Sequence, residues 1–125
     1  MDPDDGVVAS AIEVTEIAEV ARLLAHGGRG PFSEAEWAYS QSKRDPERRL
    51  ATRLAAKRAA AALLQGGVEP ADIEILPSRG GPPGIALAAR ARERLAVLGA
   101  ARVLVSLTHG VGHAAASVLL LRDRE

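Results

Sequence analysis

The segment that most constrains the fold is an alanine-rich run that begins at Asp45 and Pro46 and ends at Leu64. Asp at the N-cap followed by Pro at the first helical position is a typical start of a helix. Apolar residues recur at helical spacing along the run, and residues 65–67 (Gln-Gly-Gly) stop it. The sequence therefore predicts one long helix here, around which the rest of the chain must pack.

A strand and two shorter helices are predicted before the long helix. Residues 7–14 are apolar on both faces, which is typical of a strand, and from Thr15 apolar residues recur at i, i+3, i+4 and i+7, as on a helix. Residues 27–31 are rich in glycine and form a loop. Ser33 followed by Glu36 is a capping box, which predicts the start of the second helix.

Four strands and one helix are predicted after the long helix. They are a hairpin of strands at 72–77 and 84–88 joined by a turn at 79–83, a helix at 89–98 that ends at Gly99, and strands at 102–107 and 114–121. The order β-α-α-α-β-β-α-β-β, with its helices grouped, indicates an α+β fold with a largely antiparallel sheet. A chain of 125 residues is expected to form a single domain, 1–125.

Composition excludes several classes of protein. The 16 basic and 16 acidic side chains cancel, whereas a nucleic-acid-binding protein normally carries a basic excess. The chain has no cysteine, so disulfides and thiolate metal sites are excluded. The acidic segment 1–5 does not resemble a signal peptide, and no apolar run is long enough to span a membrane. We therefore expect a cytoplasmic protein with no membrane or nucleic-acid partner.

A few polar residues are candidates for function, and each also has a structural explanation. His109 lies in a glycine-rich turn between two strands, where most histidines are simply solvated, although loops on rigid scaffolds do carry sites. Glu13 is a carboxylate inside an apolar strand and is either exposed or functional. Arg53 and Lys57 share one face of the long helix, which could be a solvated basic face, while Arg58 points about 100° away.

Six segments together resemble the holo-acyl-carrier-protein synthase family, a branch of the 4'-phosphopantetheinyl transferase superfamily. They are IEVTEI (12–17), FSEAEWAY (32–39), RLAAKR (53–58), DIEIL (72–76), GPP (81–83) and SLTH (106–109). They occur in the order and at the spacing of the family, and they extend over nearly the whole chain. The resemblance implies the family's α+β fold.

The resemblance also implies an activity. Members of the family transfer the phosphopantetheine arm of coenzyme A to a serine of an acyl carrier protein, in fatty acid or polyketide biosynthesis. They typically form trimers with active sites between subunits. Magnesium is held by an Asp on the first strand, a Glu on the long helix and the coenzyme pyrophosphate, as suits a hard cation that bridges phosphate oxygens.

The residues that match the family's site come from several segments. The resemblance implies that coenzyme A is bound by Arg53 on the long helix, by the glycine-proline turn and by the last predicted hairpin. The turn residues are Gly81 and Pro83, and the hairpin residues that match the phosphate-contacting segment are Ser106, Thr108 and His109. Because the end of a strand that enters a glycine-rich turn presents backbone N–H groups, we expect these three hairpin residues to line one anion pocket. The candidate catalytic residues are Glu13, Lys57 and His109.

The magnesium positions depart from the family pattern. The strand Asp is Glu13 here, one methylene longer, and the helix Glu is Arg58. A guanidinium has no lone pair to donate, so it cannot replace a carboxylate on magnesium. Ala62 stands where the family usually has a lysine. Glu19 stands where the first helix of the family often offers an arginine to the carrier protein. We expect that Glu13 and Arg58 form a salt bridge in place of the metal and that magnesium does not bind.

Three hypotheses remain open at this point. The first is an active transferase in which a guanidinium contacts the pyrophosphate directly. The second is a repurposed relative without magnesium-dependent activity, in which Glu13 and His109 act as acid/base groups on an acyl chain tethered to a carrier protein. The third is a non-catalytic subunit of a trimer.

Overall fold

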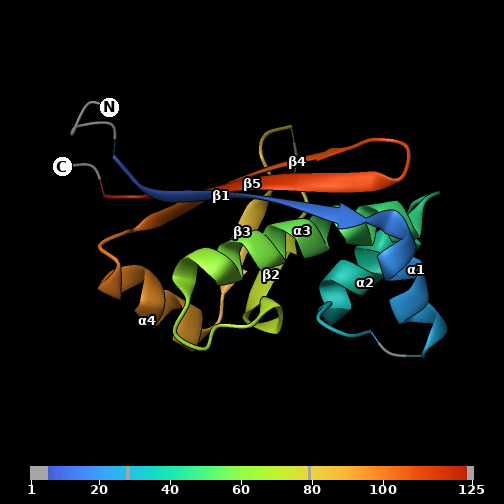
Figure 1. Cartoon of the computed structure of the whole chain (residues 1–125), viewed down its shortest axis with the longest axis horizontal. Helices are drawn as coiled ribbons and strands as arrows, with labels where there is room; N and C mark the ends of the chain where they lie inside the picture. The colour runs from blue at the N-terminus through green and yellow to red at the C-terminus, as the bar shows by residue number, and fades with distance from the viewer. Residues whose placement is uncertain (1–5, 28, 79, 124–125) are drawn as a thin grey trace.

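The computed structural model describes residues 6–27, 29–78 and 80–123, and its elements follow the predicted order (Figure 1). The elements are β1 (Val7–Glu16), α1 (Ile17–Ala25), α2 (Glu34–Gln41), α3 (Pro46–Leu64), the short 3-10 helix η1 (Pro70–Asp72), β2 (Ile73–Leu76), β3 (Gly84–Leu87), α4 (Ala89–Val97), β4 (Arg102–His109) and β5 (His113–Leu121). The acidic segment 1–5 lies outside the described residues, as do residues 124–125 and also Gly28 and Arg79, which belong to the predicted loop 27–31 and the predicted turn 79–83. The predicted α+β class and element order are confirmed.

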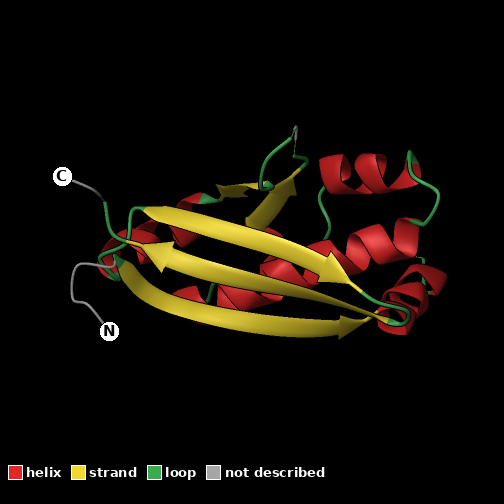
Figure 2. Cartoon of the chain, turned by 90° about the horizontal axis from the view of Figure 1, so that it is seen from above, coloured by secondary structure: helices red, strands yellow, loops and turns green. Residues whose placement is uncertain are grey.

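Two antiparallel sheets form the β layer. The larger sheet has the order β1-β5-β4, and β2 and β3 form the predicted hairpin beside it (Figure 2). The register of the larger sheet places Glu13 opposite Ala116 and His109 opposite Ala114. Glu13 and His109 therefore belong to opposite edge strands, with β5 between them.

Helix α3 packs under one face of the larger sheet, and the other described helices lie on the same side (Figure 1). The contact is made of small side chains: buried alanines of α3 meet alternate residues of β5 in the main core, including Ala116, Val118 and Leu120. A second cluster joins the start of α3 to Val20 of α1 and to Phe32. With only three aromatic residues in the chain, the core consists mainly of alanine, valine, leucine and isoleucine, as expected.

The opposite face of the larger sheet is open in this chain. Ile12 and Val14 on β1 are 76% and 58% exposed, and Leu104 on β4 is 43% exposed. Strand alternation explains the pattern, because successive side chains point to opposite faces. The sheet therefore presents apolar side chains to whatever lies above it.

Local signals predicted most element ends. Ser33 and Glu36 form the capping box of α2 in both directions. Gln65 ends α3 with a φ of 58°, and two glycines with positive φ follow it. One detail is wrong: Asp45 occupies the N-cap position of α3 but makes no side-chain cap, because its carboxylate pairs with Arg48 and Arg49 instead.

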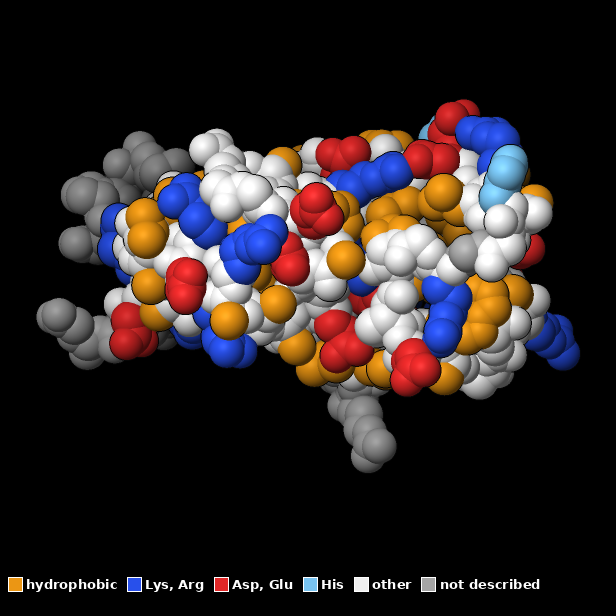
Figure 3. Space-filling model, turned by 90° about the horizontal axis from the view of Figure 1, so that it is seen from below, with side chains coloured by type: hydrophobic (Ala, Val, Ile, Leu, Met, Phe, Trp, Pro, Cys, Tyr) orange, Lys and Arg blue, Asp and Glu red, His pale blue; other side chains and the backbone are white. Residues whose placement is uncertain are grey.

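The surface opposite the sheet carries acidic and basic side chains mixed with apolar ones (Figure 3). This distribution agrees with the zero formal net charge of the chain. Among the described helices, none is both long and apolar enough to cross a membrane.

Candidate functional site

A cationic pocket of about 270 Å³ lies between the start of α3, the end of α2, the β2–β3 loop and β4. Its lining residues are Tyr39, Arg48, Arg49, Thr52, Arg53, Ser78, Pro83, Leu107 and His109. We call it the arginine pocket. The structure thus brings together Arg53, Pro83 and His109, which come from three of the segments that the sequence singled out.

Arg53 is held rigidly in the arginine pocket. Its guanidinium lies 4.5 Å from the ring centre of Tyr39, at a distance typical of a cation–π contact. Its Nη1 donates to the carbonyl of Arg49 (3.3 Å) and to Oγ1 of Thr52 (3.1 Å). Burial lowers the pKa of Arg53, but an arginine stays protonated at neutral pH. The pocket therefore contains a fixed positive charge.

Arg48 adds a polar group without a partner. Its Nε is buried and makes no hydrogen bond to any described residue, although its Nη2 pairs with Asp45. A buried donor of this kind costs free energy unless a ligand or water satisfies it. Together with the cations of Arg49 and Arg53, it suits a phosphate, whose oxygens accept several charge-assisted hydrogen bonds.

The β2–β3 loop borders the arginine pocket through Ser78 and Pro83. Oγ of Ser78 donates to the carbonyl of Gly81 and accepts from its N–H at 3.1 Å, which closes the turn. Gly81 itself is exposed and does not line the pocket. Its predicted contact with the coenzyme remains a prediction.

Within a single chain, Ser106, Thr108 and His109 do not line one pocket, and their predicted contact with the coenzyme phosphates stays a prediction. His109 borders the arginine pocket, whereas Ser106 lies in a shallow pocket on the open face of the sheet, beside Leu104 and Ser117. Thr108 is exposed and lies two positions from Ser106 on β4, so both side chains point to the same face of the sheet. The physical reason is the alternation of side chains along β4, which separates neighbours to opposite faces.

Lys57 is fully buried and lies outside the lining of the arginine pocket. Its Nζ donates to Oε1 of Glu36 at 2.5 Å. Burial lowers the pKa of Lys57, and the bond to Glu36 opposes that shift. Glu36 also accepts from the N–H groups of Ser33 and Ile75, both at 2.8 Å, so one carboxylate joins α2, α3 and β2. The structure gives Lys57 a structural role, and its predicted catalytic role remains untested.

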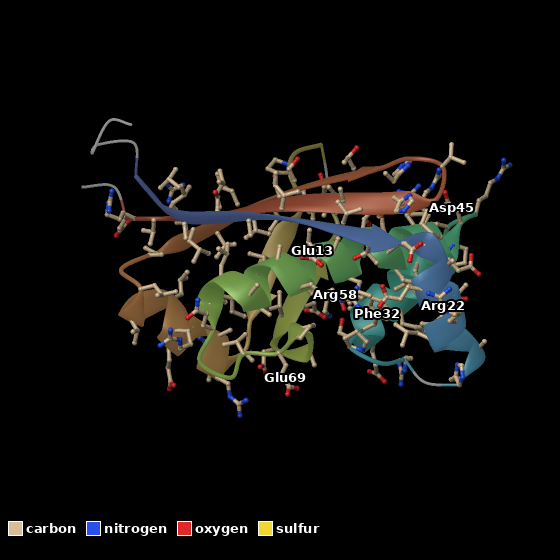
Figure 4. All side chains as sticks on the ribbon, viewed as in Figure 1. Glu13, Arg22, Phe32, Asp45, Arg58 and Glu69 are labelled. Atoms are coloured by element: carbon tan, nitrogen blue, oxygen red, sulfur yellow. The ribbon has the colours of Figure 1, made fainter. Side chains whose placement is uncertain are left out.

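The predicted salt bridge between Glu13 and Arg58 is wrong, because Arg58 pairs with Glu19 of α1. Nη1 of Arg58 donates to Oε1 of Glu19 at 3.0 Å, and Nη2 donates to Oε2. The hydrogen bonds with Glu19 raise the pKa of Arg58, and the charge of Glu13 adds to this shift, although no ion pair joins Arg58 to Glu13. Glu13 and Arg58 lie on neighbouring β1 and α3 (Figure 4). This partner was not predicted from the sequence, because Glu19 was considered only as the position at which the family often has an arginine.

The residues at the magnesium positions do not fit that ion. Glu13 offers one half-buried carboxylate, and both oxygens of Glu19 are already bonded to the Arg58 guanidinium. Within the described part of the chain, no group of three or more histidine and acidic side chains could hold a metal. A divalent cation beside Glu13 would also face the positive charge of Arg58. We therefore assign no step of a reaction to magnesium held by this chain.

The Glu19–Arg58 pair is expected to make stability depend on pH. The hydrogen bonds from Arg58 hold the pKa of Glu19 below its ordinary value of 4.5. A lowered carboxyl pKa stabilises the fold above the ordinary value, and this contribution is lost as the pH falls through the lowered pKa. Because about a third of each side chain is exposed, Glu19→Gln is expected to cost about 1 kcal/mol or less at pH 7. Urea unfolding of both proteins should show this difference shrinking below about pH 4; a difference that stays constant down to pH 3 would contradict the assignment.

The candidate residues fall into two groups on different sides of α3. Arg53 and Arg58 are five positions apart, which turns their side chains about 140° from each other. Arg53 faces the arginine pocket with His109 of β4, whereas Arg58 faces Glu19 of α1 and Glu13 of β1. The sequence overlooked Tyr39, Arg48 and Arg49, although helical spacing from Arg53 would have placed Arg49 on the same face.

No model of a known protein family matches the sequence. The holo-[acyl-carrier-protein] synthase of Anaeromyxobacter dehalogenans is 35% identical over 127 residues, which cover 91% of this chain and 95% of that protein. The fold agrees with solved structures. The acyl carrier protein synthase of Mycobacterium tuberculosis is 28% identical, with a TM-score of 0.73 and coverage of 94% of this chain and 100% of that one. The Chronobacterium ammoniagenes enzyme in complex with CoA is 27% identical, with a TM-score of 0.67 and coverage of 93% and 99%. At this identity and coverage, the chain belongs to the holo-[acyl-carrier-protein] synthase family.

Proposed function

We propose that this protein transfers the 4'-phosphopantetheine group of coenzyme A to a serine of an acyl carrier protein. The observation that carries the proposal is the arginine pocket, which is lined by Arg48, Arg49, Arg53 and His109. The Nε of Arg48 is buried and has no hydrogen-bond partner among the described residues. Coenzyme A presents a 3'-phosphate and a pyrophosphate, which are anions of the kind that fixed guanidinium groups bind. The relative that was solved in complex with CoA supports the same ligand.

The reaction needs a cationic site and a base. The serine oxygen bonds to the phosphorus of the phosphopantetheine group, the pyrophosphate bond breaks, and 3',5'-ADP leaves with the electron pair. The arginines of the pocket bind that leaving group and stabilise its charge. The serine proton goes to a carboxylate or an imidazole, for which Glu13 and His109 are the candidates.

The active form is proposed to be a homotrimer with sites between subunits. Two observations support an assembly. The open sheet face exposes Ile12, Val14 and Leu104, which a partner surface would cover. In addition, the two groups of candidate residues lie on different sides of α3, so one domain cannot easily apply both to one substrate. We place this trimer of single-domain chains in the cytoplasm, in fatty acid or polyketide biosynthesis.

Mass spectrometry tests the proposed reaction. Apo acyl carrier protein incubated with this protein and coenzyme A should gain the mass of phosphopantetheine. Arg53→Ala should remove the activity and weaken 3',5'-ADP binding about 10- to 100-fold, because a charge-assisted contact in the pocket is lost. Arg102→Ala, an exposed arginine of β4 that does not line the pocket, is the matched control.

The repurposed relative remains the second candidate, because Arg58 stands where the resemblance places a metal ligand. An unmodified carrier protein, together with 3',5'-ADP binding that Arg53→Ala abolishes, would favour this candidate. An unmodified carrier protein with no binding of coenzyme A or 3',5'-ADP at millimolar levels would contradict both.

A further inference from the structure

We infer that the Glu19–Arg58 pair is a built-in substitute for a divalent cation, so that no such ion binds beside Glu13. This inference rests on the proposed function for its meaning, because it makes the transfer independent of a metal held by the protein. Its structural part concerns only three side chains, from β1, α1 and α3, and can be tested without the reaction.

The first step is the way in which Arg58 is held. Its two terminal nitrogens donate to the two oxygens of Glu19, a two-point arrangement that fixes both the position and the plane of the guanidinium. The two side chains are 32% and 34% exposed, so the pair is partly shielded from water. The guanidinium is therefore an ordered part of the structure.

The second step is the surroundings of Glu13. Its side chain is half-buried on the face of β1 that also carries Thr15, and Thr15 has a buried hydroxyl without a hydrogen-bond partner among the described residues. Glu13 and Arg58 lie on the neighbouring elements β1 and α3 (Figure 4) and attract each other electrostatically, although no ion pair joins them. A carboxylate beside a fixed cation already has its charge compensated, and it gains less from a metal ion than an isolated carboxylate would.

The third step is the cost of admitting a cation. An ion at Glu13 would lie near a guanidinium that is always protonated and has no lone pair. To recruit Glu19 as a second ligand, the ion would have to break both hydrogen bonds to Arg58. The pair thus excludes a divalent cation in two ways. The positive charge of Arg58 repels the ion, and the hydrogen bonds from Arg58 keep the Glu19 carboxylate from coordinating it.

Replacing the guanidinium by a carboxylate gives a sharp test. In the variant Arg58→Glu, the positive charge is removed and both oxygens of Glu19 are released from their hydrogen bonds. A further carboxylate then stands on α3, on the same element as the removed guanidinium and near Glu13. The matched control is Arg29→Glu, which makes the same exchange in an exposed pair with Glu34 and leaves the surroundings of Glu13 unchanged.

The probe is Mn²⁺ alone, titrated by electron paramagnetic resonance in the absence of coenzyme A and carrier protein. Wild type and control should bind no Mn²⁺ at millimolar levels. The variant Arg58→Glu should bind Mn²⁺ at least about tenfold more tightly than the wild type, because free carboxylates are ligands for a hard cation, and a further Glu13→Ala should abolish that binding. If Arg58→Glu fails to fold, Arg58→Gln, which removes the positive charge alone, should also raise the affinity.

Two results would overturn the inference: Mn²⁺ binding to the wild type that Glu13→Ala removes, or folded variants lacking the Arg58 charge that bind no better than the wild type. Failure of the proposed function looks different. A wild type that binds no Mn²⁺ and modifies no carrier protein leaves the substitution standing and removes the transfer. Modification that persists in excess EDTA supports both.

Discussion

Glu36→Ala is expected to lower the free energy of unfolding by about 3–5 kcal/mol, because it leaves the ammonium of Lys57 buried and unpaired. Lys57 and Glu36 are 0% and 1% exposed, so water cannot replace the missing carboxylate without opening the core. The same change removes the acceptor for the N–H groups of Ser33 and Ile75. Urea unfolding measures the loss.

Glu34→Ala is the matched control for this loss. Glu34 begins the same helix but is exposed, and its ion pair with Arg29 is 3.7 Å long. A change within about 0.5 kcal/mol is expected there. The double variant Glu36→Ala/Lys57→Met should recover part of the stability, because replacing both partners of a buried pair removes the unpaired charge. A loss below about 1 kcal/mol for Glu36→Ala alone would show that the pair is not buried as described.

Mixing two inactive variants is expected to restore activity, if the proposed trimer places the two groups of residues at one subunit interface. Glu13→Ala damages the group on the β1 side of α3, and Arg53→Ala damages the arginine pocket. Each variant alone should be nearly inactive. After refolding together, about a quarter of the interfaces in randomly mixed trimers should combine two intact sides. Carrier-protein modification measured by mass spectrometry gives the recovered fraction.

The control for this experiment is the same mixture without refolding, in which subunits have not exchanged. A site contained in one chain predicts no recovery, since every protomer then carries one lesion. Light scattering should show a trimer for each variant before mixing, and a monomer at micromolar concentration would contradict the proposed assembly.

The sequence predicted the elements well because local signals specify them. The capping box of Ser33 and Glu36, the glycines after Gln65 and the period of α3 each act within a few residues. The pairing of charges was not predictable in the same way. Glu19 and Arg58 are 39 positions apart, and helical spacing says which face a side chain occupies but not what lies opposite.

Sequence proximity was also a poor guide to which site residues share a pocket. Ser106, Thr108 and His109 are neighbours in sequence, but a strand sends alternate side chains to opposite faces. In contrast, Arg53, Pro83 and His109 are far apart in sequence and lie around one pocket. The resemblance to the family could name these residues, whereas only the fold could place them.

The alanines between α3 and the larger sheet determine how close the helix lies to the strands that carry the other site residues. Ala55, Ala56, Ala59 and Ala60 of α3 are at most 1% exposed, and they belong to the same core cluster as Ala116 of β5, which is 2% exposed. Where methyl groups face each other, the helix axis approaches the sheet closely, and an alanine has no flexible side chain that could absorb an error in packing. One added methylene here would lift the helix and carry its arginines away from the strands, so the reach between Arg53 and His109 depends on the smallest side chains in the core.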